Sequence, residues 1–232
     1  MALKSFPSKL ASILLGITLF CAATPGFAQA KGMRRGQIPV VKTNALTGQA
    51  RNNFVKIHQE LASTFISLRD FAAGFSGGQP DRLAAVYVQG LLAARIVQQP
   101  ADVPEFVSPR GNIVTQFSTA NRYGATGLLA HNYLVGASFH KLVTGHSIHL
   151  IFADGHVVEY LVTSTLRYQA LEPRNPASNF VDLLTGTRLS AAKVVSSAYN
   201  RPGSLVLQTC IEAEGNKSWG RLFVIAEPVI EN

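Results

Sequence analysis

The sequence predicts a mainly β fold, an antiparallel β-barrel with short helices, preceded by an α-helical N-terminal region. Beyond residue 104, short β-rich segments alternate with turn residues, a pattern typical of a sandwich or a closed barrel. Between residues 51 and 103, apolar residues recur every three or four positions instead, which is typical of helices. With 232 residues, 47% of them hydrophobic, the chain is long enough to bury a core without disulfides.

Residues 1–30 have the pattern of a secretory signal peptide. Two lysines precede an apolar segment, Leu10–Ala23, and small residues follow it up to Ala30. Because these 14 apolar residues fall short of the about 20 that span a bilayer, cleavage after Ala30 is favoured over a retained membrane anchor. Phe20 is too bulky to precede a lipid-modified Cys21, which disfavours a lipoprotein. We therefore expect an extracytoplasmic protein, whether secreted, periplasmic or associated with the cell surface, with no stable transmembrane anchor.

The positive charge gathers at the N-terminus. Six of the 21 Lys and Arg residues lie in the first 50 positions, which contain no Asp or Glu. The rest of the chain carries 15 basic and 13 acidic residues, so the formal charge of +8 falls to +2 for the part expected to fold. That part has no basic face interleaved with aromatic residues, so we expect no nucleic-acid partner. Residues 31–50 are basic and without periodicity, and they are expected to form a flexible linker.

Two helices are expected within the N-terminal region, residues 51–103. Apolar residues follow helical spacing from Arg51 to Phe75, and the glycines after Phe75 end this pattern. Asp81 is then a candidate cap for a second helix that reaches about Gln98. Its Val86-Tyr87-Val88 centre and Gly90 are unfavourable for a helix.

Six strands are expected between residues 104 and 232. Asp154-Gly155 indicates a tight hairpin between the third and the fourth. The long connection Thr165–Gly203 separates the fourth from the fifth, and a helical turn is expected in it near Ser178–Leu184. The expected strands are Asn112–Phe117, Thr126–His131, Ser147–Phe152, His156–Thr163, Ser204–Ile211 and Trp219–Ala226.

Cys210 is the one cysteine that remains if Cys21 leaves with the signal peptide. It ends one apolar strand, and Arg221 stands near the start of the next. If these strands pair as a hairpin, the thiol and the guanidinium can share a pocket, because opposed residues lie about 5 Å apart. A guanidinium stabilises a thiolate and can hold the oxyanion of an acyl-transfer intermediate. In the alternative interpretation Cys210 is a buried small hydrophobe, and Arg221 pairs with Glu212 or Glu214 at the surface.

His131 stands where another apolar strand gives way to a polar turn. From the residues alone it is either a hydrogen-bonded structural histidine or a catalytic one. His146 and His149 lie three apart on a predicted strand, so they face opposite sides and cannot share a metal ion. Since no CxxC or HExxH pattern accompanies them, no zinc site is expected.

Three segments resemble motifs of the sortase family. The segment from Leu128 to Gly145 is similar to the part of sortases that carries the catalytic His and an F-x-x-L-x-x-G-D element, with His146 in place of the Asp. Val206–Cys210 resembles the T-L-x-T-C signature, with Val in place of the first Thr. Arg221, eleven residues further on, matches the essential arginine. The order His, Cys, Arg is that of the family, and the resemblance spans about residues 104–228.

The resemblance implies a sortase-like catalytic β-barrel over residues 104–232 that acts as a cysteine transpeptidase. Cys210 would attack a peptide carbonyl in an extended sorting motif of an exported protein. His131 would protonate the leaving amine and Arg221 would stabilise the oxyanion, while Thr209 would contribute its backbone or hydroxyl to the site. An amine on the cell envelope or on another protein would then resolve the thioester. No cofactor or metal is implied, and calcium activation stays open.

Two alternatives keep the same barrel. A thiol hydrolase or endopeptidase would use His131, Cys210 and Arg221 with water as the acceptor, since the sequence indicates no second protein substrate. An inactive secreted binding module would need none of the three residues. The presence of all three in the family's order favours an enzyme.

Overall fold

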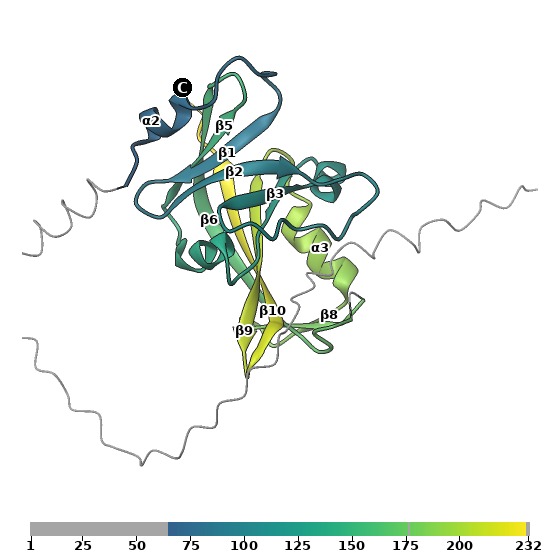
Figure 1. Cartoon of the computed structure of the whole chain (residues 1–232). Coiled ribbons are helices and arrows are strands. Elements are labelled where there is room, and N and C mark those ends of the chain that lie inside the picture. Colours follow the sequence, from purple (N-terminus) through teal and green to yellow (C-terminus); the bar gives the residue numbers. More distant parts are fainter. Residues whose placement is uncertain (1–64, 176, 231–232) are drawn as a thin grey trace, which may run out of the picture. The chain divides into compact units, whose positions relative to one another are not determined.

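A single sheet closes on itself to form the body of the molecule (Figure 1). The structure, a computed structural model, describes residues 65–175 and 177–230. Ten strands in this part pair in the order β10-β9-β4-β3-β2-β1-β5-β6-β7-β8, and a further pairing of β10 with β6 closes the first eight into a barrel. The strands are β1 Leu83–Val88, β2 Leu92–Gln98, β3 Ile113–Phe117, β4 Thr126–Leu129, β5 Ser147–Phe152, β6 Val157–Ala170, β7 Phe180–Asp182, β8 Arg188–Leu189, β9 Leu205–Ala213 and β10 Asn216–Pro228.

Four short helices accompany the barrel in the described residues. Two are α-helices and two are 3₁₀-helices, namely α2 Leu68–Ala73, η2 Ser118–Tyr123, η3 Val135–Lys141 and α3 Ala191–Tyr199. Ser67 caps the N-terminus of α2, because its side chain accepts a hydrogen bond from the Asp70 backbone N–H. The prediction of a mainly β barrel with short helices is confirmed.

The barrel is mixed, and the prediction of an antiparallel barrel is wrong. β2 pairs parallel to β3, and β4 pairs parallel to β9, while the other pairs are antiparallel. A parallel pair needs a connection long enough to return the chain to the starting end of the sheet. The segment between Gln98 and Ile113 does this for β2 and β3, and the strands β5 to β8 intervene between β4 and β9. The spacing of the strands in the sequence does not show whether two neighbouring strands run parallel or antiparallel.

The helix predicted for Asp81–Gln98 is also wrong, because this segment forms the β1–β2 hairpin of the barrel. Gly90 takes a φ of +69° in the turn, a conformation that glycine adopts without steric cost. All six residues of β1 are buried. Val86 faces the barrel interior while Tyr87 packs outward against Phe71 of α2, with ring centroids 5.9 Å apart. Burial on both faces removes the alternation that would have marked a strand.

Of the first predicted helix, Arg51–Phe75, the described residues contain only α2. The predicted signal peptide, the linker and residues 51–64 lie outside the described residues. Within the described part of the chain, no helix has the length and apolar character needed to cross a membrane.

The connection between β6 and β9 differs from its prediction. The turn expected as helical near Ser178–Leu184 contains β7 instead, and the helix α3 follows further on. The Ser190 side chain caps α3 by accepting from the Lys193 backbone N–H. β6 runs past its predicted end at Thr163 because β10 pairs with it as far as Gln169. The other predicted strands are confirmed with small shifts at their ends, as is the Asp154-Gly155 hairpin turn.

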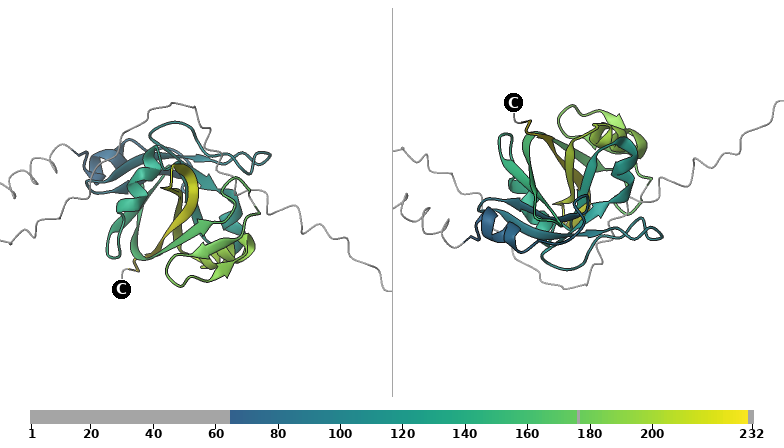
Figure 2. Two further views of the ribbon diagram at one scale, coloured as in Figure 1. Left: turned by 90° about the horizontal axis from the view of Figure 1, so that it is seen from below. Right: turned by 90° about the horizontal axis from the view of Figure 1, so that it is seen from above.

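Two hydrophobic clusters lie on the two sides of the barrel wall. The interior cluster takes residues from all eight barrel strands. The outer cluster joins β9 and β10 to η2 and to α3, which lies against the outside of the barrel (Figure 2). Side chains alternate along β9, so that Leu207 and Ile211 face the interior while Val206 and Cys210 face the outer cluster.

Candidate active site

Cys210 and Arg221 lie level with each other on neighbouring strands, and His131 lies level with Cys210 just beyond the end of β4. Cys210 of β9 is directly opposite Arg221 of β10 in the antiparallel register. On its other side, the parallel pairing of β4 with β9 continues to the Ala130 N–H, which donates to the Gln208 carbonyl at 3.2 Å. The next residue, His131, is therefore level with Cys210. Neighbouring strands are about 4.8 Å apart, so the structure brings the three predicted residues together.

This row of residues is buried in the outer wall of the barrel. Directly opposed residues put their side chains on the same face of a sheet, so Arg221 shares the outer face with Cys210. The exposed fraction is 0% for Cys210, 4% for Arg221 and 6% for His131. Water is therefore largely excluded from these side chains, which strengthens electrostatic interactions among them.

The guanidinium of Arg221 is held by backbone carbonyls. Its Nη1 donates to the carbonyls of Ser218 at 3.1 Å and Gly220 at 2.9 Å, and its buried Nε has no hydrogen-bond partner. In the part of the chain that the structure describes, Arg221 forms no ion pair with Glu212 or Glu214, which the alternative interpretation required. A buried cation that no carboxylate neutralises is available to stabilise an anion brought next to it.

Tyr168 of β6 extends the row on the far side of Arg221, opposite it in the β6–β10 register. Burial raises the pKa of Tyr168, and the Asp182 carboxylate raises it further, while Arg201 and a hydrogen bond to Ser197 lower it. The phenol is therefore neutral beside the guanidinium at ordinary pH.

His131 is fixed through its backbone and through its ring. Its carbonyl accepts from the N–H groups of Leu134 at 3.0 Å and Gly136 at 3.1 Å, which shape the loop after β4. The imidazole stacks on Tyr133, with ring centroids 5.0 Å apart and planes 22° apart. Its Nδ1 is buried without a hydrogen-bond partner. Buried polar atoms are seldom left unpaired, and those that are often have a functional role.

Thr209 lies on the opposite face of β9 from Cys210, because side chains alternate along a strand. Its hydroxyl donates to the Ala130 carbonyl at 2.8 Å, in a buried hydrogen bond. The hydroxyl that the sequence interpretation gave to the site is thus engaged with the residue that precedes His131. This hydrogen bond ties β9, which carries Cys210, to the loop that carries His131.

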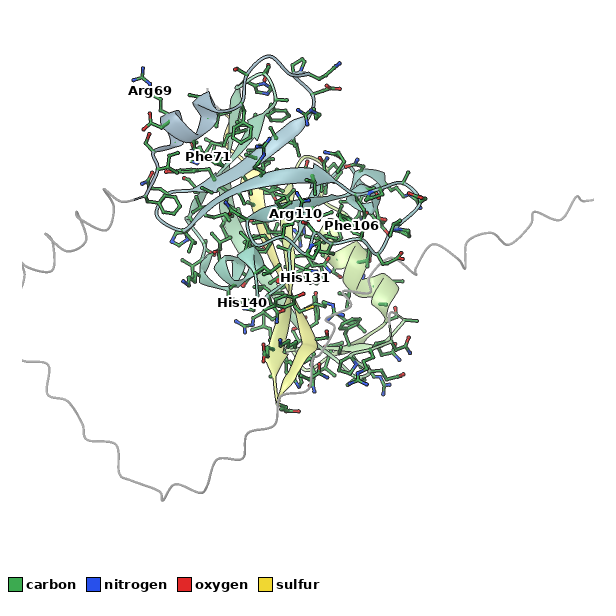
Figure 3. All side chains as sticks on the ribbon, in the orientation of Figure 1. Arg69, Phe71, Phe106, Arg110, His131 and His140 are labelled. Atoms are coloured by element: carbon green, nitrogen blue, oxygen red, sulfur yellow. The ribbon has the colours of Figure 1, made fainter. Side chains whose placement is uncertain are left out.

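His140, which the sequence interpretation did not consider for this site, contacts the backbone of Cys210. Its Nε2 lies 3.0 Å from the Cys210 carbonyl oxygen, where the tautomer with a proton on Nε2 donates. β4 ends at Leu129. Further along the chain, η3, which carries His140, packs beside β9. Figure 3 shows His131 and His140 beside the yellow strands β9 and β10. Nothing in the spacing of His140 marks it, since a chain separation of 70 residues is bridged by the fold.

No three His, Cys, Asp or Glu side chains among the described residues gather closely enough to hold a metal ion. The row of Cys210, Arg221 and His131 itself offers a thiol, a guanidinium and an imidazole.

Solved structures of sortases are similar to this chain, whereas no family model and no curated protein matches it. Sortase C-1 from Actinomyces oris is 14% identical with a TM-score of 0.44, and the match covers 74% of this chain and 85% of that one. Sortase E1 from Streptomyces coelicolor, solved with a tripeptide in the active site, is 19% identical with a TM-score of 0.40, covering 66% of this chain and 92% of that one. Sortase A from Listeria monocytogenes is 14% identical with a TM-score of 0.40, covering 63% and 86%. At these identities and TM-scores the similarity bears on neither activity nor substrate.

Proposed function

We propose that this protein is a sortase-like cysteine transpeptidase of the extracytoplasmic space. It would cleave a sorting motif in exported proteins and transfer the acyl group to an amine of the cell envelope or of another protein. The observation that carries the proposal is the direct opposition of Cys210 and Arg221, with His131 level with Cys210 just beyond the end of β4. The three motifs that resemble sortases support the same residues in the same roles.

In the first half-reaction the Cys210 sulfur attacks the peptide carbonyl carbon and forms a C–S bond. The carbonyl oxygen becomes an oxyanion, which the Arg221 guanidinium stabilises by charge and by hydrogen bonding. When the tetrahedral intermediate collapses, the C–N bond breaks and His131 gives a proton to the leaving amine. The product is a thioester on Cys210 and a released peptide with a new amino terminus.

In the second half-reaction an acceptor amine attacks the thioester carbonyl. The C–S bond breaks, the thiolate leaves, and the proton lost by the amine returns to His131. Water in place of the amine would give hydrolysis with the same bonds broken. An ordinary thiol has a pKa of about 8.5 and is a few per cent thiolate at neutral pH, so attack proceeds from a minority form or from one that the neighbouring cation enriches.

The burial of the row supports acyl transfer over a surface role for Arg221. The guanidinium is aligned by the Ser218 and Gly220 carbonyls before any substrate arrives, so little reorganisation is needed when the oxyanion forms. A side chain whose orientation is set in advance stabilises a developing charge better than one that must be ordered during the reaction.

The test incubates the purified protein with a library of extended peptides and seeks the acyl adduct on Cys210 by mass spectrometry. Adding primary amines to the same reaction separates transfer from hydrolysis. We expect no adduct with Cys210→Ala, and a fall in acylation of about 10²–10³-fold with Arg221→Lys, which keeps the charge but loses the planar fork. Arg167→Lys, at an exposed position on β6, is the matched control and should acylate normally.

Two results together would contradict the enzyme proposal. The wild-type protein would acquire no adduct from any peptide of the library, and Cys210→Ala would behave as wild type in every assay. Products that appear only as hydrolysed peptide, whichever amine is supplied, would favour the hydrolase instead.

A further inference from the structure

The imidazole of His131 lacks the hydrogen bond that usually orients a catalytic histidine. In most such sites one ring nitrogen is held by a carboxylate or a carbonyl, which fixes both the tautomer and the plane of the ring. Here Nδ1 of His131 is buried and has no hydrogen-bond partner. Some other contact must therefore set the direction in which the ring faces.

The contact that the structure offers is the ring of Tyr133. The two rings are stacked with centroids 5.0 Å apart and planes 22° apart, within the range of favourable offset stacking. Tyr133 is 47% exposed, whereas His131 is 6% exposed. Because nearly half of the Tyr133 side chain is exposed to water, the ring gains little stability from its own burial. Its placement is better explained by what it does to the neighbouring ring.

Tyr133 is in turn attached to the hairpin that carries Cys210 and Arg221. The Lys217 Nζ of β10 lies 5.2 Å from the centroid of the Tyr133 ring, a cation–π distance. The Asn132 Nδ2 donates to the Lys217 carbonyl at 3.1 Å. Lys217 stands four residues before Arg221 on the same strand. Two contacts to Lys217, one from the Tyr133 ring and one from the Asn132 side chain, thus join the loop that carries His131 to the β9–β10 hairpin.

We propose that Tyr133 is a positioning residue for His131. Its ring, which contacts both the imidazole of His131 and the ammonium group of Lys217, sets the plane of the imidazole relative to the thiol of Cys210. This inference rests on the proposed function, since it assigns Tyr133 a part in the same site. Stacking replaces the missing hydrogen bond to Nδ1, and Lys217 keeps the stack attached to the strand of Arg221.

The test compares Tyr133→Leu with Tyr133→Phe in the full protein. Leucine removes the stack, so we expect kcat for acyl transfer to fall by about 10- to 100-fold with little change in KM, because a misplaced proton donor slows chemistry more than binding. Phenylalanine retains the ring and should restore kcat. Lys217→Met should lower kcat less, and Lys193→Met, an exposed lysine on α3, is the matched control with no effect.

A second measurement does not depend on turnover. The NOE signals between the His131 ring protons and neighbouring side chains other than residue 133, followed by NMR, should change in Tyr133→Leu and stay as in wild type in Tyr133→Phe. A Tyr133→Leu protein with wild-type kcat and unchanged His131 signals overturns the positioning role alone. A wild-type protein that never acylates Cys210 overturns the proposed function, and the NMR comparison then still decides whether Tyr133 orients the His131 ring.

Discussion

Thr209 and Ala130 are joined by a buried hydrogen bond of 2.8 Å, from the Thr209 hydroxyl to the Ala130 carbonyl. One partner directly precedes Cys210 and the other directly precedes His131. The bond therefore spans the parallel strands at the point where the two predicted catalytic residues come level. It sits on the barrel side of the wall, while the thiol and the imidazole belong to the outer side.

Replacing Thr209 tests whether this bond holds the site in register. Thr209→Val keeps the shape of the side chain but removes the donor from a buried carbonyl, so we expect a loss of about 1–3 kcal/mol in the free energy of unfolding. Thr209→Ser keeps the hydroxyl and should lose less, about the value of one buried methyl group, ~1 kcal/mol. Urea unfolding measures both, and a valine variant as stable as the serine one would contradict the importance of the bond.

Gly136 packs against the same bond. A Cβ at this position would lie 2.6 Å from the His131 carbonyl oxygen, 2.6 Å from the Thr209 hydroxyl and 2.8 Å from the Ala130 carbonyl oxygen. Because two of these atoms are backbone, Gly136→Ala should destabilise the protein by about 1–3 kcal/mol and displace the His131 loop. Gly111→Ala is the matched control, since nothing lies within 4 Å of its Cβ. Equal melting temperatures for the two variants would refute the close packing.

The hydrogen bond from His140 to the Cys210 carbonyl predicts a graded response. His140→Leu removes the donor and should cost about 0.5–1.5 kcal/mol of stability, with slower acylation of Cys210 because η3 no longer holds the Cys210 carbonyl of β9. His140→Gln places an amide N–H within reach of the same carbonyl and should retain most of both properties. Urea unfolding and the rate of thioester formation measure the effect. Lys141→Leu, an exposed change on the same helix, should alter neither quantity.

Buried tyrosines predict a loss of stability at high pH. Burial raises the pKa of Tyr199 above its ordinary value of 10.0, and the same cause raises the pKa of Tyr87, Tyr160 and Tyr168. The unfolded chain then releases these protons at a lower pH than the folded one. The contribution to stability is therefore complete below about pH 10 and is lost as the pH rises above it.

Tyr199→Phe should make that decline less steep, since one of the raised groups is gone. It should also lower stability at neutral pH by about 1–3 kcal/mol, because the Gln208 side-chain oxygen loses the phenol that donates to it at 2.6 Å. Urea unfolding at about pH 8 and at several values above pH 10 gives both numbers. An unchanged slope in the variant would show that Tyr199 does not titrate differently in the two states.

The pairing of the strands that carry Cys210 and Arg221 was predictable from the sequence because a hairpin joins consecutive strands. Their exact opposition depends on a register shift between Asn216 and Gly220, without which Arg221 would lie opposite Gln208. The positions of most strands beyond residue 104, and the Asp154-Gly155 turn, were predictable for the same reason. The strand β1 was mistaken for part of a helix because both of its faces are buried, which hides the alternation of a strand.

The arrangement of the rest of the site was decided by the tertiary structure. His131 comes level with Cys210 only through the parallel pairing of β4 with β9, across 79 residues of chain. The contacts of His140 and Tyr133 with the β9–β10 hairpin exist only in the folded barrel, because they join segments that are far apart in the sequence. The sequence by itself determined the three kinds of side chain and the pairing of the two consecutive strands that carry Cys210 and Arg221. Closure of the barrel decided which distant groups surround them, because contacts between remote segments depend on the packing of the whole sheet.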